Sequence, residues 1–336
     1  MKVSALGEFG LIELLAGLVG RGVTEETARR GLILGIGDDA AAWRTTSAIQ
    51  LATTDTMVQG VHFTLEAATW RELGWKAMAV NLSDIAAMGG SPQWALVTVG
   101  LPDDTEVDSV VELYRGMLEL AGPSQTAIIG GDTISSPLVV ITLSVMGEAT
   151  GNALLTRSSA RPGDEVAVTG MLGASAAGLA MLKRHLNFDP QTTAFLRAAH
   201  LRPQPRLAEG RILIEHGVRA AIDLSDGLIA DLGHICQESR VAARVRVDRV
   251  PLHPLARAAF PAEALGLALS GGEDYELLFT APPSLMSRVA GHLPPPATVI
   301  GEIVEGEPGR VTLLDSGGRE IAWQRGGWDH FKAKGT

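Results

Sequence analysis

Apolar and polar residues follow each other along this chain with two different periods, which predict helices and strands in turn. The clearest helix spans 69–88, where Met78, Leu82 and Ile85 recur at intervals of three and four residues and Gly89 ends the pattern. Similar patterns predict the other helices over 8–20, 105–121, 173–185, 190–200, 205–216, 226–238 and 261–268. Short apolar runs predict strands over 49–55, 93–100, 126–130, 138–148, 165–169, 219–223, 242–248, 274–280, 297–303 and 310–314. Because strands and helices alternate in both halves, we expect an α/β fold built from α+β layers.

The length of 336 residues predicts two domains, at a prior of one domain per ~150 residues. A turn-rich stretch, with Gly151-Asn152 at its start and Arg161-Pro162-Gly163-Asp164 at its end, separates two series of strands and helices. We therefore place an N-terminal domain at 1–150 and a C-terminal domain at 151–336.

The composition is that of an ordinary globular protein, but its charge narrows the choice of partners. The formal net charge of −10 argues against nucleic acid and anionic membrane surfaces, and the five lysines form no basic run. Glu8 and Glu13 interrupt the apolar stretch near the N-terminus, which argues against a signal peptide. No segment approaches the ~18 apolar residues of a membrane span. We expect a soluble, cytoplasmic protein.

The single cysteine, Cys236, excludes an intrachain disulfide and suits a reducing compartment. It shares an apolar helical stripe with Leu228, Leu232 and Ile235. That spacing predicts a buried thiol in the core.

The main indication of function is a set of carboxylate residues that recur in similar local contexts. Asp or Glu stands beside glycine or a small hydroxyl residue where a strand or helix ends, at Asp38, Asp39, Asp55, Asp84, Asp132, Asp223, Asp226, Glu273 and Asp274. Each one alone is more often a turn or cap residue. The repetition at strand ends, where α/β sheets bind ligands, predicts a common site. Clustered carboxylates repel one another unless cations lie among them, so the pattern favours Mg²⁺ and, through it, a polyphosphate.

Two glycine-containing segments support the same interpretation. Gly130-Gly131-Asp132 and Ser270-Gly271-Gly272-Glu273-Asp274 allow a ligand to approach the backbone closely, or else they form tight turns. The chain contains neither GxxxxGK[ST] nor GxGxxG, so an ATP-using enzyme of this sequence would use neither common phosphate-binding loop.

The segment Asp223-Leu224-Ser225-Asp226-Gly227 connects an expected strand to an expected helix. It would aim backbone N–H groups and two carboxylates at one point, as a metal–phosphate site requires. The alternative is that Ser225 or Asp226 only caps the helix.

Three further residues have a functional and an ordinary interpretation. Asp84 either faces the site or is a surface carboxylate on its helix. His62 either contacts a phosphate or is a half-buried histidine. Arg157 either reaches a phosphate from the domain boundary or is solvated.

Taken together, these motifs resemble the bacterial thiamine-monophosphate kinases. The matching stretches follow one another over nearly the whole chain and are Gly7-Glu8-Phe9-Gly10-Leu11-Ile12, Gly35-Ile36-Gly37-Asp38-Asp39-Ala40, Thr53-Thr54-Asp55-Thr56, Gly60-Val61-His62-Phe63, Ala79-Val80-Asn81-Leu82-Ser83-Asp84-Ile85-Ala86-Ala87-Met88-Gly89, Gly130-Gly131-Asp132-Thr133, Ile222-Asp223-Leu224-Ser225-Asp226-Gly227-Leu228, Asp231-Leu232-Gly233-His234-Ile235 and Leu269-Ser270-Gly271-Gly272-Glu273-Asp274-Tyr275-Glu276-Leu277. This family is similar in fold to aminoimidazole-ribonucleotide synthetase and selenophosphate synthetase.

The resemblance implies a homodimer in which the sheet of domain 1–150 pairs with that of a second subunit. It implies that this domain binds ATP and several Mg²⁺ ions and that domain 151–336 completes the active site. The γ-phosphoryl group of ATP would pass directly to the phosphate of thiamine monophosphate, without a catalytic side chain forming a covalent intermediate.

The resemblance also assigns site residues. The magnesium shell would be Asp39, Thr53, Thr54, Asp55, Asp84, Asp132, Asp223 and Asp226. The nucleotide contacts would be Tyr114, Gly131, Asp132, Arg157 and Ser225. The thiamine-phosphate contacts would be His62, Glu273 and Trp328.

The chain departs from the family pattern at two places. Trp328 stands where the family often has tyrosine, although a larger ring can still stack on a heterocycle. Ile134-Ser135 follows Gly-Gly-Asp-Thr where the family often has Thr-Arg, which affects one contact on the phosphate side and not the metal site.

Three rival functions remain open at this point. Another ATP-using enzyme of the same fold would activate an amide or a selenide, but the selenide activity usually brings a reactive cysteine near the N-terminus, and the only cysteine here is Cys236. A metal-dependent phosphohydrolase would release phosphate without an acceptor. A non-catalytic sensor would bind Mg-ATP without turnover.

Overall fold

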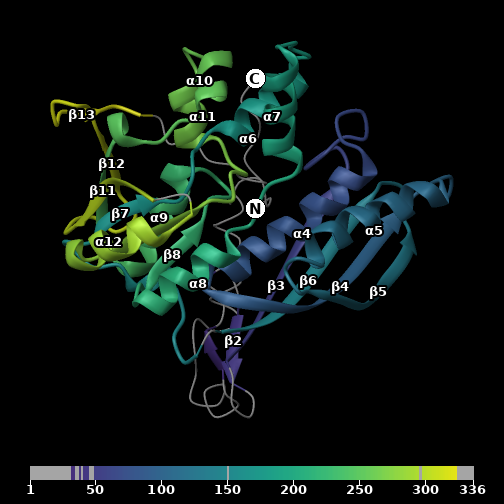
Figure 1. Ribbon diagram of the computed structural model, residues 1–336, viewed down its shortest axis with the longest axis horizontal. Coiled ribbons are helices and arrows are strands. Elements are labelled where there is room, and N and C mark those ends of the chain that lie inside the picture. Colours follow the sequence, from purple (N-terminus) through teal and green to yellow (C-terminus); the bar gives the residue numbers. More distant parts are fainter. Residues whose placement is uncertain are drawn as a thin grey trace, which may run out of the picture.

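Two β-sheets with a long helix packed against both make up the architecture of the computed structural model (Figure 1). The structure describes residues 32–34, 38, 41–44, 49–149, 151–294 and 297–323. The helix expected over 8–20 lies outside these residues. Among the described helices, none is both long and apolar enough to cross a membrane.

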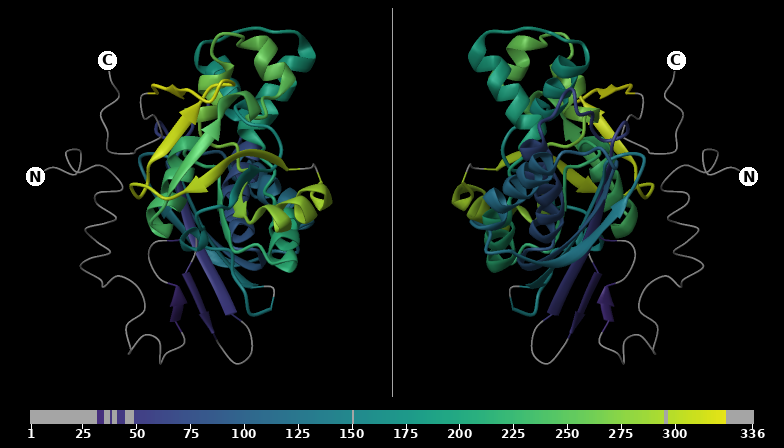
Figure 2. Two further views of the ribbon diagram at one scale, coloured as in Figure 1. Left: turned by 90° about the vertical axis from the view of Figure 1, so that its left-hand side faces the viewer. Right: turned by 90° about the vertical axis from the view of Figure 1, so that its right-hand side faces the viewer.

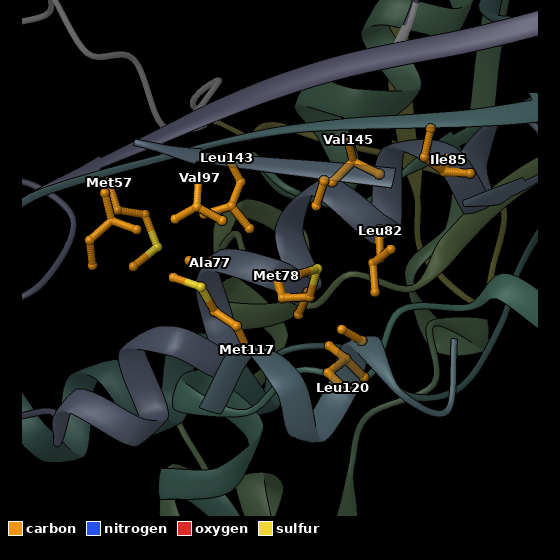
Figure 3. Packing of buried hydrophobic residues seen from close by; sticks show 14 of the residues in the cluster. Met57, Ala77, Met78, Leu82, Ile85, Val97, Met117, Leu120, Leu143 and Val145 are labelled. Atoms are coloured by element: carbon orange, nitrogen blue, oxygen red, sulfur yellow. The ribbon is translucent and has the colours of Figure 1, made fainter. Parts of the chain in front are cut away.

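The N-terminal sheet has six strands in the order β1-β2-β3-β6-β4-β5, and only β4 and β5 are parallel neighbours. The strands are β1 (Leu32–Leu34), β2 (Ala41–Arg44), β3 (Ile49–Val58), β4 (Gly90–Leu101), β5 (Ala127–Ser135) and β6 (Val140–Ala149). Helices α4 (Trp70–Ala87) and α5 (Val107–Ala121) cover one face of this sheet. Met78, Leu82 and Met117 of the helices pack in one buried cluster with Val97 and Leu143 of the strands (Figure 3).

The C-terminal sheet has seven strands in the order β13-β12-β9-β11-β7-β10-β8. These are β7 (Glu165–Val168), β8 (Ala220–Asp223), β9 (Ala242–Arg246), β10 (Leu277–Ala281), β11 (Thr298–Val304), β12 (Val311–Leu314) and β13 (Glu320–Ile321). Its helices are α6 (Ala174–Lys183), α7 (Pro190–Leu201), α8 (Leu207–His216), α9 (Leu228–Ser239), α10 (Pro254–Ala259), α11 (Ala264–Ser270) and α12 (Pro283–Val289). Figure 2 shows α6, α7 and α10 projecting together beyond the sheet, where they share a small apolar cluster.

Helix α4 is buried on most of its circumference. A capping box begins it, because the amide of Glu72 donates to the Thr69 hydroxyl and the Glu72 carboxylate accepts from the Thr69 amide. Gly89 follows its end with φ +70°, a conformation that glycine adopts without strain. Thirteen of its 18 residues are buried, because α4 lies on the N-terminal sheet and also contacts α8 and β8. A helix that is buried all round belongs to the core.

Two glycines allow α4 and α5 to pack with their backbones in contact. A Cβ atom on Gly74 would lie 1.8 Å from the carbonyl oxygen of Leu113, and one on Gly116 would lie 1.9 Å from that of Arg71. Since no side chain fits at these distances, both positions require glycine.

Most expected elements are confirmed, and the differences have identifiable causes. The strand expected over 126–130 continues to Ser135. Gly130 and Gly131 predicted its end, but both pair with residues of β4 and belong to the strand. The short helices α10 and α12 were not expected, since six or seven residues show too little periodicity and both begin with proline.

The prediction of a buried Cys236 is confirmed, and burial raises the pKa of its thiol to about 12.

The substitution Gly116→Ala should destabilise the fold by about 1–3 kcal/mol, because the added methyl group forces α5 away from α4. This loss should occur although alanine is intrinsically better than glycine in a helix by about 1 kcal/mol. Urea denaturation measures the difference. Gly233→Ala in α9 is the control, since a Cβ there would meet only the carbonyl oxygen of Gly309 at 3.6 Å. Equal losses in the two variants would contradict the explanation.

Candidate active site

The turn between β8 and α9 lies against helix α4 of the N-terminal domain. Asp223 ends β8 and is buried, and its Oδ2 accepts a hydrogen bond of 2.6 Å from the hydroxyl of Ser83 on α4. The bond holds a carboxylate of one domain against the central helix of the other.

The segment 223–227 is joined to the segment 270–276 by backbone hydrogen bonds. The amide of Glu273 donates to the carbonyl oxygen of Ser225 at 2.8 Å, and that of Tyr275 donates to Leu224 at 2.9 Å. The amide of Leu224 donates in return to Glu276 at 2.9 Å. These bonds continue the pairing of β8 with β10 beyond the strands, so the two segments form one unit.

Glycine is required where these two segments touch. A Cβ atom on Gly272 would lie 2.2 Å from the carbonyl oxygen of Ser225. Gly227 has φ +113°, and a Cβ there would lie 2.9 Å from the carbonyl carbon of Ser270. The glycines that suggested a ligand loop therefore also serve the close approach of two backbones.

Strand β3 and helix α4 supply the carboxylates of the N-terminal domain. The hydroxyl of Thr53 donates to Oδ2 of Asp84 at 2.5 Å, so Asp84 is not a free surface carboxylate. Asp55 lies on the same face of β3 as Thr53, two residues along. The hydroxyl of Thr54 lies on the opposite face, where it donates to the carbonyl oxygen of Leu143 and accepts from Ser144.

Carboxylates of both domains act on the buried phenol of Tyr275. Burial raises the pKa of Tyr275 well above its usual value, and four carboxylates raise it further. They are those of Glu273, Asp55, Asp223 and Asp84. The structure thus brings predicted metal ligands from both domains around one side chain.

Asp226, Asp231 and His234 form a group that could hold a metal ion, since one ligand atom of each lies within 4.8 Å of the others. Oδ2 of Asp231 accepts hydrogen bonds from the amides of Asp226 at 3.1 Å and Gly227 at 3.0 Å. Burial, followed by repulsion from Asp226 and Asp223, raises the pKa of Asp231 well above its usual value. Asp231 therefore shapes the turn that carries Asp226.

Asp231 and His234 were missed by the sequence-based assignment. The spacing in the sequence could have identified them. Asp231 comes four residues after Gly227 and His234 comes three residues after Asp231, so Gly227, Asp231 and His234 lie on one face of the helix. The alternative that Ser225 or Asp226 caps α9 is wrong: the N-cap residue is Gly227, and within the described residues no side-chain cap bond is made there.

Arg157 lies at the junction of the domains and is not a solvated arginine. Its side chain is 21% exposed, and its amide donates to Oδ2 of Asp38 at 3.0 Å. Its carbonyl oxygen accepts from Ser239 at 2.7 Å. Its charge offsets part of the rise in the pKa of Asp231 and adds to the effect of burial in lowering the pKa of His234. A cation is therefore present beside the carboxylates of the β8–α9 turn.

The two described residues expected to contact thiamine phosphate come from different domains and lie near each other. His62 follows β3, and its Nδ1 accepts from the amide of Val58 at 3.0 Å. Burial would raise the pKa of Glu273, but Lys76 and, more weakly, His62 outweigh it and hold this pKa below its usual value.

Neighbouring acidic residues of the 270–276 segment have structural partners that sequence reasoning did not identify. Glu276 accepts from the hydroxyl of Thr169 and from Nε of Arg206, each at 2.6 Å. Asp274 accepts from the amides of Gly173 at 2.8 Å and Ser175 at 3.3 Å, at the beginning of α6. This acidic segment is thus anchored at several points.

For the remaining expected site residues, the structure gives no contact with the carboxylates described above, or the residue lies outside the described part of the chain. Gly131 and Asp132 are exposed on β5. Gly131 has φ +154°, and a Cβ there would lie 1.7 Å from the carbonyl oxygen of Val97, so this position requires glycine. Tyr114 is half-buried on α5. Asp39 and Trp328 lie outside the described residues, and all five assignments stay predictions.

The residues that the structure brings together fit Mg²⁺. Their donors are carboxylate and hydroxyl oxygens, which are the ligands that this hard cation prefers. Burial and, after it, the neighbouring Asp226 and Asp223 disfavour the charged form of Asp231, and a cation among these carboxylates would relieve their repulsion.

The half-buried Asp274 should make the stability of the protein depend on pH. Burial raises its pKa to about 7, so between about pH 4 and 7 the folded chain retains a proton that the unfolded chain releases. Stability should therefore fall as the pH rises through this window, with a contribution from Asp274 of at most about 1.4 kcal/mol per pH unit. Urea denaturation should give a flatter pH profile for Asp274→Asn than for the wild type. Parallel profiles would contradict this assignment.

Comparison with known proteins identifies the family. Residues 37–149 match "AIR synthase related protein, N-terminal domain" and residues 161–313 match the corresponding C-terminal domain. The thiamine-monophosphate kinase of Escherichia coli K12 is 40% identical over 333 residues, which cover 97% of this chain and 99% of the relative.

Solved structures agree with this. AaThiL complexed with AMPPCP and TMP superposes with a TM-score of 0.86 at 34% identity, covering 98% of this chain and 99% of that one. Thiamine monophosphate kinase from Aquifex aeolicus gives a TM-score of 0.80 at 32% identity, covering 96% and 99%. With the site geometry and the full-length match in agreement, the chain belongs to the thiamine-monophosphate kinase family.

Proposed function

We propose that this protein transfers the γ-phosphoryl group of ATP to the phosphate of thiamine monophosphate, giving thiamine diphosphate and ADP. The observation that carries this proposal is the near-complete superposition on AaThiL complexed with AMPPCP and TMP. The carboxylates that act on the buried Tyr275 supply the negative charge that attracts the Mg²⁺ ions of a nucleotide. A cytoplasmic location accompanies the proposal as a prediction from the sequence.

Mg²⁺ would be held by Asp55, Asp84, Asp223 and Asp226, with Thr53 orienting Asp84. When bound, it would neutralise the phosphates and the charge that develops on them during transfer. Asp39 and Asp132 complete the proposed shell by resemblance, whereas the hydroxyl of Thr54 lies on the other face of β3 and does not point to this shell.

The residues of this chain act mainly by positioning. The acceptor is a phosphate oxygen that is already anionic near neutral pH, so it needs no strong general base. Burial lowers the pKa of His200 to about 3 and that of His234 to about 4, so neither carries a positive charge near neutral pH. Arg157 and Ser225 would contact the nucleotide, and His62, Glu273 and Trp328 the thiamine phosphate.

The direct test is ³¹P NMR of the protein with ATP, Mg²⁺ and thiamine monophosphate. A diphosphate-ester signal should grow together with ADP only when all components are present. ATP consumption without that signal would instead support hydrolysis or another acceptor. Absence of ATP consumption would support a nucleotide sensor.

The substitution Asp55→Asn should reduce turnover by at least about 100-fold, because it removes a proposed metal ligand at which charge is neutralised in the transition state. It should change the free energy of unfolding by no more than about 1 kcal/mol, because Asp55 is only half-buried. Steady-state kinetics at saturating Mg²⁺ and urea denaturation measure the two effects. Wild-type turnover in this variant would refute the metal assignment.

The protein is further proposed to be a homodimer that pairs through the N-terminal sheet. Trp94 and Leu96 are 47% and 39% exposed and alternate along β4 with the buried Ala95 and Val97, so they face away from α4 and α5. Ile129 on the neighbouring β5 is also exposed, at 55%. An apolar surface of this kind is typical of an interface.

The double substitution Trp94→Glu and Leu96→Lys should convert the dimer into a monomer of 35.3 kDa, because it places charges on the proposed interface. Light scattering after size-exclusion chromatography measures the mass. Leu118→Lys on α5 is the control, since Leu118 is 55% exposed on the helical layer. A wild-type protein that elutes as a monomer at micromolar concentration would argue against the dimer.

A further inference from the structure

Lys76 is a buried lysine in the middle of α4 whose partner lies in the other domain. Its side chain is 3% exposed, and its Nζ lies 2.8 Å from Oε1 of Glu273. Lysine is almost never fully buried unless it is paired, and breaking such a pair leaves an uncompensated charge. The contact therefore fixes the position of both side chains.

Glu273 is held in an unusual conformation from both sides. It has φ +65°, which is uncommon for a residue with a side chain, and its amide is bound to the carbonyl oxygen of Ser225. Its Oε2 lies 3.3 Å from Nδ1 of His200 on α7, and that Nδ1 lies 3.2 Å from the hydroxyl of Ser175. Strained residues of this kind persist only where their surroundings hold them.

The charges around Glu273 make Lys76 its principal counter-ion. His200 is neutral, as its pKa of about 3 indicates, and His62 is the other basic group whose charge acts on Glu273. Asp274 and Tyr275 follow in the chain but bring no positive charge. Since 30% of the Glu273 side chain remains exposed, the pair leaves part of this carboxylate available to a ligand.

We propose that Lys76 is a positioning residue for the second substrate: through its contact with Glu273, it holds that carboxylate in the orientation that binds the cationic, organic part of thiamine monophosphate. This inference rests on the proposed function. Lys76 itself touches no substrate, so its removal should affect the binding of thiamine monophosphate far more than that of ATP.

The test is a double-mutant cycle with Lys76→Met, Glu273→Gln and the combined variant, with KM and kcat measured for each substrate. Lys76→Met should raise the KM for thiamine monophosphate at least about tenfold, which corresponds to one lost charge-assisted contact. The KM for ATP should change less than about twofold. The combined variant should be no worse than Glu273→Gln alone, because Lys76 acts only through Glu273.

A matched control is available on α4, the helix that carries Lys76, and on α7. Arg197 of α7 forms a two-bond pair with Glu72 of α4, at 2.8 and 2.6 Å. Arg197→Met should lower the melting temperature without changing the KM for thiamine monophosphate selectively. This control separates a general loss of contact between the domains from the effect of Lys76.

Three outcomes would overturn the inference: an unchanged KM for thiamine monophosphate in Lys76→Met, equal rises for both substrates, or additive effects in the combined variant. If Lys76→Met does not fold, the combined variant carries the test, since it leaves neither charge of the pair unbalanced. A KM for thiamine monophosphate more than about fivefold above that of Glu273→Gln would then refute the inference. Failure of the wild type to form thiamine diphosphate would instead refute the proposed function.

Discussion

Asp231 lies buried beside Asp226 and Asp223, and the repulsion among these carboxylates is the constraint on which the site depends. Like charges in a poorly solvated region favour protonation or separation. The fold prevents separation by giving individual carboxylates a fixed donor. Ser83 binds Asp223, Thr53 binds Asp84, and two backbone amides bind Asp231.

Helix α4 connects these arrangements. Ser83 and Lys76 contact residues of the C-terminal domain, while its apolar residues pack on the N-terminal sheet. A helix that is covered on both sides cannot shift without disturbing both domains. The position of α4 therefore determines how the carboxylates of the two domains face one another, and the close contact at Gly74 and Gly116 fixes α4 against α5.

The sequence predicted the elements that depend on local pattern and missed those that depend on pairing in space. The helix over 69–88 was predicted within a residue or two because five turns of periodic apolar residues leave little ambiguity. The end of β5 was wrong, because its glycines act as strand residues only when β4 lies beside them.

The same distinction holds for the site. Asp55, Asp84 and Asp223 could be selected because they recur in motifs that resemble a known family. Their partners could not, since the Ser83–Asp223 bond joins residues 140 positions apart and nothing local marks Ser83 as a donor. The role of Lys76 could not be predicted either, because a lysine on a helix normally indicates a solvated face.

The central claim is that carboxylates from both domains share bound metal ions with the phosphates of the nucleotide. The most direct measurement is anomalous diffraction from crystals grown with Mn²⁺ in place of Mg²⁺, AMPPCP and thiamine monophosphate. The account predicts Mn²⁺ peaks at about 2.0–2.3 Å from oxygens of Asp55, Asp84, Asp223 or Asp226 and from the phosphates of the nucleotide. A bound nucleotide whose Mn²⁺ ions touched none of these carboxylates would contradict the account.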